Sequence, residues 1–237
     1  MLKKLTNPRV LIAAFIGLVA LFVVAYFALF SRDSPPEFSL QTKGSTENSA
    51  AAPPAGDPAG TWTVAEGSQA GYRVREKLAN LPAPSDAVGR TTAVTGQVTI
   101  VDEGGSYSAR DARFTVDVSQ LKSDQDKRDN RIRTMGLETG KYPQATFAAA
   151  GPIAIPKAAV NGQAVTVSAE GDMTLHGMTK RITIPLQVQR SGTEIRIVGN
   201  YDFSWDDFGM TAPSVPPFVS VTGNPKLEFD LKLSKQA

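Results

Sequence analysis

His176 is the one histidine in the 237-residue chain, so any catalysis that uses an imidazole depends on this residue. A Ser-His-Asp triad would also need a nucleophilic serine, and no Gly-x-Ser-x-Gly motif supplies one. A zinc site with several histidines is impossible, and the absence of cysteine excludes thiolate nucleophiles and cysteine-bound metals. We therefore predict no catalytic residue, no metal site and no cofactor, and interpret Leu175-His176-Gly177 as a hairpin turn.

Paired carboxylates offer a second kind of chemistry. Asp206 and Asp207 follow Trp205, and Asp202 lies nearby. Acidic pairs beside aromatic residues occur in enzymes that cleave sugars, where the two carboxyl groups flank the scissile bond. Such pairs are more common at exposed strand ends, which is the interpretation we adopt. A carboxylate-based hydrolase is thus the weakest functional hypothesis, and we predict that the protein is not an enzyme.

Aromatic side chains form the remaining candidate site. The candidate ligand-binding residues are Tyr72, Phe114, Phe147, Trp205, Phe208 and Phe218. We expect Phe114 and Phe147 to line an internal cavity. Trp205 and Phe208 stand in a Gly-containing segment, and Phe218 follows a Pro-rich loop, so we expect these three near a cavity mouth. The alternative is that these aromatic residues fill an ordinary core.

The elements that must position these residues are short strands. Apolar and polar residues alternate with period two around residues 70–75, 114–118, 182–189, 195–197 and 227–233. Turn signals separate them at Glu103-Gly104-Gly105, Asn161-Gly162, His176-Gly177 and Ser191-Gly192. We predict an all-β, antiparallel sheet that closes into a barrel of about eight strands, because closure removes exposed edges. Two stacked sheets remain the structural alternative.

One polar stretch breaks this alternation. Residues 122–133 read KSDQDKRDNRIR and carry charges of both signs. We predict a short helix or loop at the surface. A solvated face is the simpler interpretation, and a lid or rim that contacts a polar ligand head group is the functional one.

The N-terminal region differs from the rest of the chain. Residues 10–30 form an uninterrupted apolar run of 21 residues, long enough to span a bilayer, after Lys3, Lys4 and Arg9. The run ends in bulky residues, which favours an uncleaved anchor over a cleaved signal peptide. We predict a cytoplasmic segment (1–9), a transmembrane helix (10–30), a flexible Pro-rich linker (31–60) and an extracytoplasmic barrel (61–237), held at the cell membrane.

Charge and composition narrow the partners. The formal net charge is only +2, and the predicted barrel is nearly neutral. A nucleic-acid partner is therefore not expected, because binding phosphates needs a basic face. Without cysteine, the predicted barrel must be held together by its core alone.

Several motifs, taken in order, resemble those of the polyisoprenoid-binding YceI-like proteins in their actinobacterial, membrane-anchored form. The motifs are Gly60-Thr61-Trp62-Thr63-Val64, Ala93-Val94-Thr95-Gly96, Phe114-Thr115-Val116-Asp117, Leu121-Lys122-Ser123-Asp124, Tyr142-Pro143-Gln144-Ala145-Thr146-Phe147, Gly171-Asp172-Met173-Thr174-Leu175-His176-Gly177, Asp207-Phe208-Gly209-Met210 and Leu227-Glu228-Phe229. The resemblance implies an extended lipocalin-like barrel with a hydrophobic tunnel for a polyisoprenoid chain, and no enzymatic activity.

Two functional hypotheses remain beside the hydrolase. The first is extracytoplasmic binding of a hydrophobic, lipid-like ligand in an apolar tunnel, as a carrier or sensor. The second is a structural or interaction module of the cell envelope whose barrel is filled. A continuous tunnel would favour the first hypothesis, and a solid core would favour the second.

Overall fold

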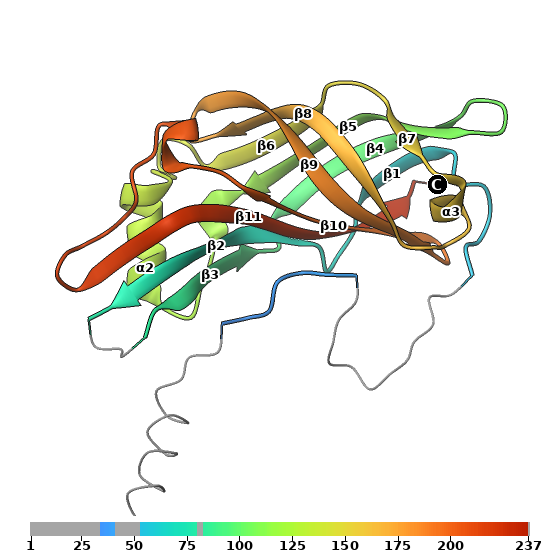
Figure 1. Ribbon diagram of the computed structural model, residues 1–237. Helices are drawn as coiled ribbons and strands as arrows, with labels where there is room; N and C mark the ends of the chain where they lie inside the picture. Colours follow the sequence, from blue (N-terminus) through green and yellow to red (C-terminus); the bar gives the residue numbers. More distant parts are fainter. Residues whose placement is uncertain (1–33, 41–52, 80–82, 237) are drawn as a thin grey trace, which may run out of the picture.

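The computed structural model describes residues 34–40, 53–79 and 83–236, which form antiparallel strands and a few short helices (Figure 1). The strands are β1 (Gly60–Val64), β2 (Gln69–Leu78), β3 (Ser85–Thr91), β4 (Val94–Asp102), β5 (Tyr107–Asp117), β6 (Gln144–Ala149), β7 (Ile153–Ile155), β8 (Val165–Leu175), β9 (Met178–Ser191), β10 (Glu194–Asp202) and β11 (Val219–Lys235). The helical segments are η1 (Val118–Gln120), α2 (Asp126–Arg131), η2 (Ile132–Gly136), α3 (Lys157–Val160) and η3 (Trp205–Phe208).

The sheet closes on itself between the first and last strands. β1 pairs with β4 on one side and with β11 on the other, where Trp62 opposes Lys235 and Val64 opposes Leu233. The closed ring runs β1-β4-β5-β6-β8-β9-β10-β11, while β2 and β3 continue from β11 and β7 pairs with β5. The predicted antiparallel barrel of about eight strands is therefore confirmed, and two separate stacked sheets do not form.

Most of the predicted turns connect hairpins. His176 and Gly177 join β8 to β9 with φ values of 51° and 74°, and Gly192 joins β9 to β10 with φ 54°. These positive φ values match the right-handed twist of the flanking strands. Asn161-Gly162 is also a turn between strands, with φ 85° at Gly162, but it follows the short helix α3 and does not connect a hairpin.

The polar stretch at residues 122–133 contains the predicted short helix, α2, but part of it is not solvated. Arg128 and Asp129 are buried. Arg128 donates to the Glu76 carboxylate on β2, and Asp129 accepts bonds from the backbone and hydroxyl of Ser123. Because Glu76 belongs to β2, the bond of Arg128 ties α2 to one end of the barrel, so α2 does not present all its charges to water.

Part of the predicted linker is docked rather than free. Residues 34–40, which we call the strap, cross the outer face of five adjacent strands (Figure 1, blue). The bonds are Ser34 Oγ to Asp86 O (2.6 Å), Arg73 Nη2 to Pro35 O (2.6 Å), Arg90 Nη2 to Pro36 O (2.6 Å), Lys226 Nζ to Glu37 Oε1 (2.9 Å), Arg196 Nη2 to Ser39 O (3.3 Å) and Leu40 N to Gln187 Oε1 (3.3 Å). Three of these six bonds use backbone carbonyls of the strap, which composition does not reveal.

Residues 53–59 cover the opposite end of the barrel, beside α3. Arg190 is buried, and its Nη2 donates to the carbonyls of Ala55 and Gly56 at 2.5 and 2.6 Å. The indole Nε1 of Trp62 donates to Pro58 O at 2.8 Å. This segment therefore satisfies buried donors of the barrel. Residues 10–30, predicted to form the transmembrane helix, lie outside the described residues, and no described helix has the length and apolar character to span a bilayer.

A charged cluster lies under the strap. Glu228 on β11 is 1% exposed and accepts bonds from Arg73 Nε at 3.1 Å and Arg90 Nη2 at 2.7 Å. The Arg90 guanidinium also lies 3.8 Å from the centre of the Phe38 ring. Because the strap excludes water from this cluster, each charge depends on its partners.

Replacing Glu228 with alanine should reduce the free energy of unfolding by about 3–5 kcal/mol, because two arginines would lose their shared buried counter-charge. Glu170→Ala is the matched control: its pair with Arg181 spans 3.5 Å between exposed side chains, so its loss should leave the unfolding midpoint nearly unchanged. Urea denaturation followed by circular dichroism measures both. Equal midpoints for the two variants would contradict the assignment.

Shortening the chain should show how residues 53–59 support the barrel. We expect a chain beginning at Gly60 to unfold cooperatively, but about 2–4 kcal/mol less stably than one beginning at Pro53, because donors of Arg190 and Trp62 lose their acceptors. Thermal and urea unfolding of the two chains provide the measurement. Indistinguishable stabilities would mean that water replaces these carbonyls without cost.

Candidate ligand-binding tunnel

Three apolar cavities lie inside the barrel. Chamber 1, of about 100 Å³, adjoins α3, and its walls include Ile100, Ile155, Val165 and Val188. Chamber 2, also about 100 Å³, has walls that include Val94, Ile184 and Phe229. Chamber 3, of about 70 Å³, adjoins η2, and its walls include Ile132, Leu137 and Met210.

The chambers form a row along the barrel. Phe114, Phe147, Ala169, Leu186 and Ile197 line both chambers 1 and 2, while Ala70, Val116, Ala145, Met173 and Leu227 line both chambers 2 and 3. Adjacent chambers are thus separated only by shared side chains. On β8 the row extends from Val165 to Leu175. Ten steps of about 3.3 Å, tilted by about 40°, give a row roughly 25 Å long.

Polar groups are scarce along this row. Arg190 borders chamber 1, where its Nη2 is held by the two carbonyls described above and its Nε has no partner among the described residues. Tyr72 borders chamber 3, and its hydroxyl is buried, also without a partner among the described residues. Burial raises the pKa of this hydroxyl far above its ordinary range, so Tyr72 stays neutral. The walls therefore suit an uncharged, apolar chain.

Large rings line the row because glycines stand beside them. A Cβ on Gly171 would lie 2.4 Å from the Phe147 ring, and one on Gly199 would lie 2.5 Å from the Phe229 ring. Gly89 stands opposite Tyr72 on the neighbouring strand and leaves space for its ring in the same way. The rings occupy the space of the missing side chains instead of projecting further into the barrel, which leaves its centre open.

Two predicted site residues face each other in the middle of the row. Phe114 on β5 and Phe147 on β6 are direct cross-strand partners, and both line chambers 1 and 2. Their position inside the barrel is as expected from the alternation. Contact with a ligand stays a prediction for both residues.

The other four candidates are dispersed. Tyr72 and Trp205 both line chamber 3. Phe208 was expected near a mouth, but it is 0% exposed and packs edge-on against Phe203, with 5.4 Å between ring centres. It is buried because the short helix η3, capped by Ser204 and Asp207, turns it inward. Phe218 is 66% exposed and lines none of the three chambers.

Most of the tunnel wall is aliphatic and was not named as a site from the sequence. β8 contributes Val165 and Val167, and β9 contributes Leu186 and Val188. The alternation on β9 was recognised as a strand signal. That alternation placed Leu186 and Val188 on a buried face of the sheet. It could not show whether the face lines a cavity or packs against other side chains.

The residues considered for catalysis have structural roles. His176 Nε2 lies 2.7 Å from the Glu138 carboxylate, and Nδ1 lies 3.1 Å from Phe208 O, so both nitrogens tie the hairpin to its neighbours. Asp207 caps η3 and accepts a bond from Lys180, which lowers the pKa of that carboxyl, opposite to the shift that a general acid needs. Within the described ranges, no three potential metal ligands come together.

Comparison with known proteins agrees with this geometry. A family model described as "YceI-like domain" matches residues 62–233. A solved polyisoprenoid binding domain from Saccharophagus degradans, implicated in plant cell wall breakdown, is 19% identical over 75% of this chain and 99% of that one, with a TM-score of 0.54. BcnA of Burkholderia cenocepacia is 20% identical over 70% and 95%, with a TM-score of 0.51. At these identities the structural likeness shows the fold. No curated protein matches the sequence significantly.

A methyl group at Gly199 should disturb the tunnel wall. It would meet only side chains, the Phe229 ring and Leu186 at 3.1 Å, so Gly199→Ala should displace them and destabilise the protein by about 1–3 kcal/mol. Gly151→Ala is the control, because nothing lies within 4 Å of its added Cβ. Thermal unfolding measures the stability of both variants. An unfolding midpoint that Gly199→Ala leaves unchanged would contradict the close packing of the Phe229 ring against Gly199.

Proposed function

Because the chain belongs to the YceI-like domain family, we propose that its barrel binds a hydrophobic, lipid-like ligand of the polyisoprenoid class inside the row of chambers. The observation that carries this proposal is the row itself. A barrel whose side chains filled its interior would show no such row of adjacent apolar spaces. The chambers therefore favour ligand binding over the alternative of a filled structural module.

The energetics suit such a ligand. Each methylene-sized group moved from water into an apolar wall contributes about 0.8 kcal/mol before ordering costs. An isoprenoid tail carries no charge, so it leaves the scarce polar groups of the tunnel undisturbed. A chain of several such groups would gain affinity along the whole row without any metal or charged partner.

The biological setting that we propose follows from the N-terminal sequence. If residues 10–30 anchor the chain with residues 1–9 in the cytoplasm, the barrel stands on the extracytoplasmic side of the cell membrane. A tunnel protein in that position would take up, hold or sense a lipid near the bilayer that contains it. The family is one of binding domains, and we propose that this member, too, catalyses no reaction.

Bound lipid is the direct test. The full chain should carry a stoichiometric hydrophobic molecule that organic extraction releases and mass spectrometry identifies. Ala169 lies where chambers 1 and 2 meet, so Ala169→Leu should narrow that junction. We expect its affinity for the lipid to fall roughly tenfold, equivalent to a loss of about 1.4 kcal/mol of binding free energy, so that the extracted lipid becomes substoichiometric.

Ser168→Leu serves as the matched control, because this neighbour on β8 is exposed on the outer face. It should retain the lipid content of the unchanged chain. Cooperative unfolding of both variants ensures that a folded barrel is compared in each case. An unchanged chain that never carries lipid would reject the proposal in favour of the interaction module.

A further inference from the structure

One end of the barrel is built from several separate segments, which we call the α2 end. It comprises α2, η2, the β8–β9 hairpin, η3 and residues 211–218. Glu138 and His176, which are bonded at 2.7 Å, join two of these segments. Pro213 contacts Gly136, because a Cβ added to that glycine would lie 3.7 Å from the proline ring. The segments therefore form one continuous surface, which covers chamber 3.

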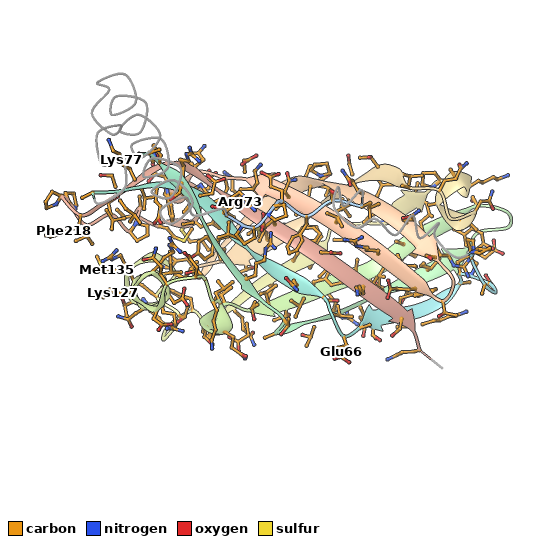
Figure 2. All side chains as sticks on the ribbon, turned by 90° about the horizontal axis from the view of Figure 1, so that it is seen from below. Glu66, Arg73, Lys77, Lys127, Met135 and Phe218 are labelled. Atoms are coloured by element: carbon orange, nitrogen blue, oxygen red, sulfur yellow. The ribbon has the colours of Figure 1, made fainter. Side chains whose placement is uncertain are left out.

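Exposed apolar side chains gather on this surface. Among the described residues, the large hydrophobic side chains that are exposed are Met135 (57%), Met178 (46%) and Phe218 (66%), and all three belong to the α2 end. Figure 2 shows Phe218 and Met135 at the same end as Lys77 and Lys127. Single exposed hydrophobic residues are ordinary, but their concentration at one end indicates an interaction surface.

Cationic side chains surround these apolar ones. Within the part of the chain that the structure describes, Lys77, Lys127, Arg131 and Arg133 form no ion pair. Of the acidic residues at this end, Glu138 is engaged by His176 and Asp207 by Lys180, whereas Asp126 and Asp206 are exposed. Apolar groups that can enter the lipid interface, with lysine and arginine beside them that can reach lipid phosphates, are typical of surfaces that lie on bilayers.

The strap places this end near the start of the chain. Its first described residue, Ser34, is bonded to Asp86 beside the beginning of β3. The neighbouring Ser85 pairs with Glu76, whose carboxylate contacts Arg128 of α2. Phe30, the last residue of the apolar run, is four peptide steps from Ser34, a distance of at most about 14 Å. A bilayer spanned by residues 10–30 would therefore lie close to the α2 end.

We propose that the α2 end docks on the surface of a lipid bilayer and that the strap fixes this orientation. The inference deepens the proposed function and rests on its membrane anchor. Docking would bring Met135, Met178 and Phe218 to the depth of the lipid head groups. One of the segments between chamber 3 and the bilayer would then be η2, whose Ile132 and Gly136 line the chamber while Met135 is exposed.

The absence of cysteine makes a site-specific test possible. Met135→Cys and Phe218→Cys in the full chain accept a single environment-sensitive fluorophore, and Ser106→Cys labels the exposed β4–β5 hairpin at the opposite end. The chains are reconstituted into vesicles of phosphatidylcholine and phosphatidylglycerol. We expect blue-shifted emission and several-fold stronger quenching by brominated lipids at positions 135 and 218 than at 106. The same emission shift and the same quenching by brominated lipids at positions 106, 135 and 218 would overturn the proposal.

The role of the strap needs a second variant. Glu37→Lys removes the bond with Lys226 and adds a positive charge beside Arg73. Combined with Phe218→Cys, it should lower lipid quenching of the label while the chain stays with the vesicles and unfolds cooperatively. Unchanged quenching would refute orientation by the strap.

Lipid extracted from the same preparations separates this inference from the proposed function. Quenched labels on an empty barrel would reject ligand binding and support docking. Bound lipid in a protein whose labels are not quenched would support ligand binding and reject docking of the α2 end.

Discussion

The pairing of β1 with β11 is the constraint on which the rest of the structure depends. These strands lie at opposite ends of the described barrel sequence, and their register, with Val64 opposite Leu233, closes the sheet. Closure leaves no free edge in the ring and encloses a fixed interior. Whether that interior is solid then depends only on the size of the inward side chains. Here glycine and alanine occupy enough inward positions to leave it hollow.

The sequence predicts the strands and the fold class well, because both depend on local rules. Period two places Phe114 on an inner face, and positive φ favours glycine at the His176-Gly177 turn. The hollow interior is a different kind of property. It results from the summed volume of side chains on strands that are far apart in sequence, so alternation alone could not separate Ile182, which is buried in the core, from Ile184, which lines chamber 2.

The strap shows a second limit of local interpretation. The predicted linker that contains the strap, residues 31–60, is rich in proline, serine and alanine and has too few apolar groups to fold by itself, which predicts a free segment. Its partners are arginines on the barrel, Arg73 and Arg90, which bind carbonyl oxygens that every sequence possesses. Nothing in the composition of the segment reveals such an attachment. The same arginines also hold Glu228, so the charged outer face organises both the sheet and the chain that crosses it.

The rings that lie against glycines along the tunnel have a consequence for evolution. One such pair is Phe229 and Gly199, which also face each other in the backbone ladder of β10 and β11, so the width of the tunnel there depends on their side chains while the ladder holds the wall. Exchanging a single small or large residue would therefore change the width of the tunnel at that position and leave its width elsewhere unchanged. Successive point mutations can therefore adapt such a barrel to ligands of different width, and each variant along the way keeps the same fold.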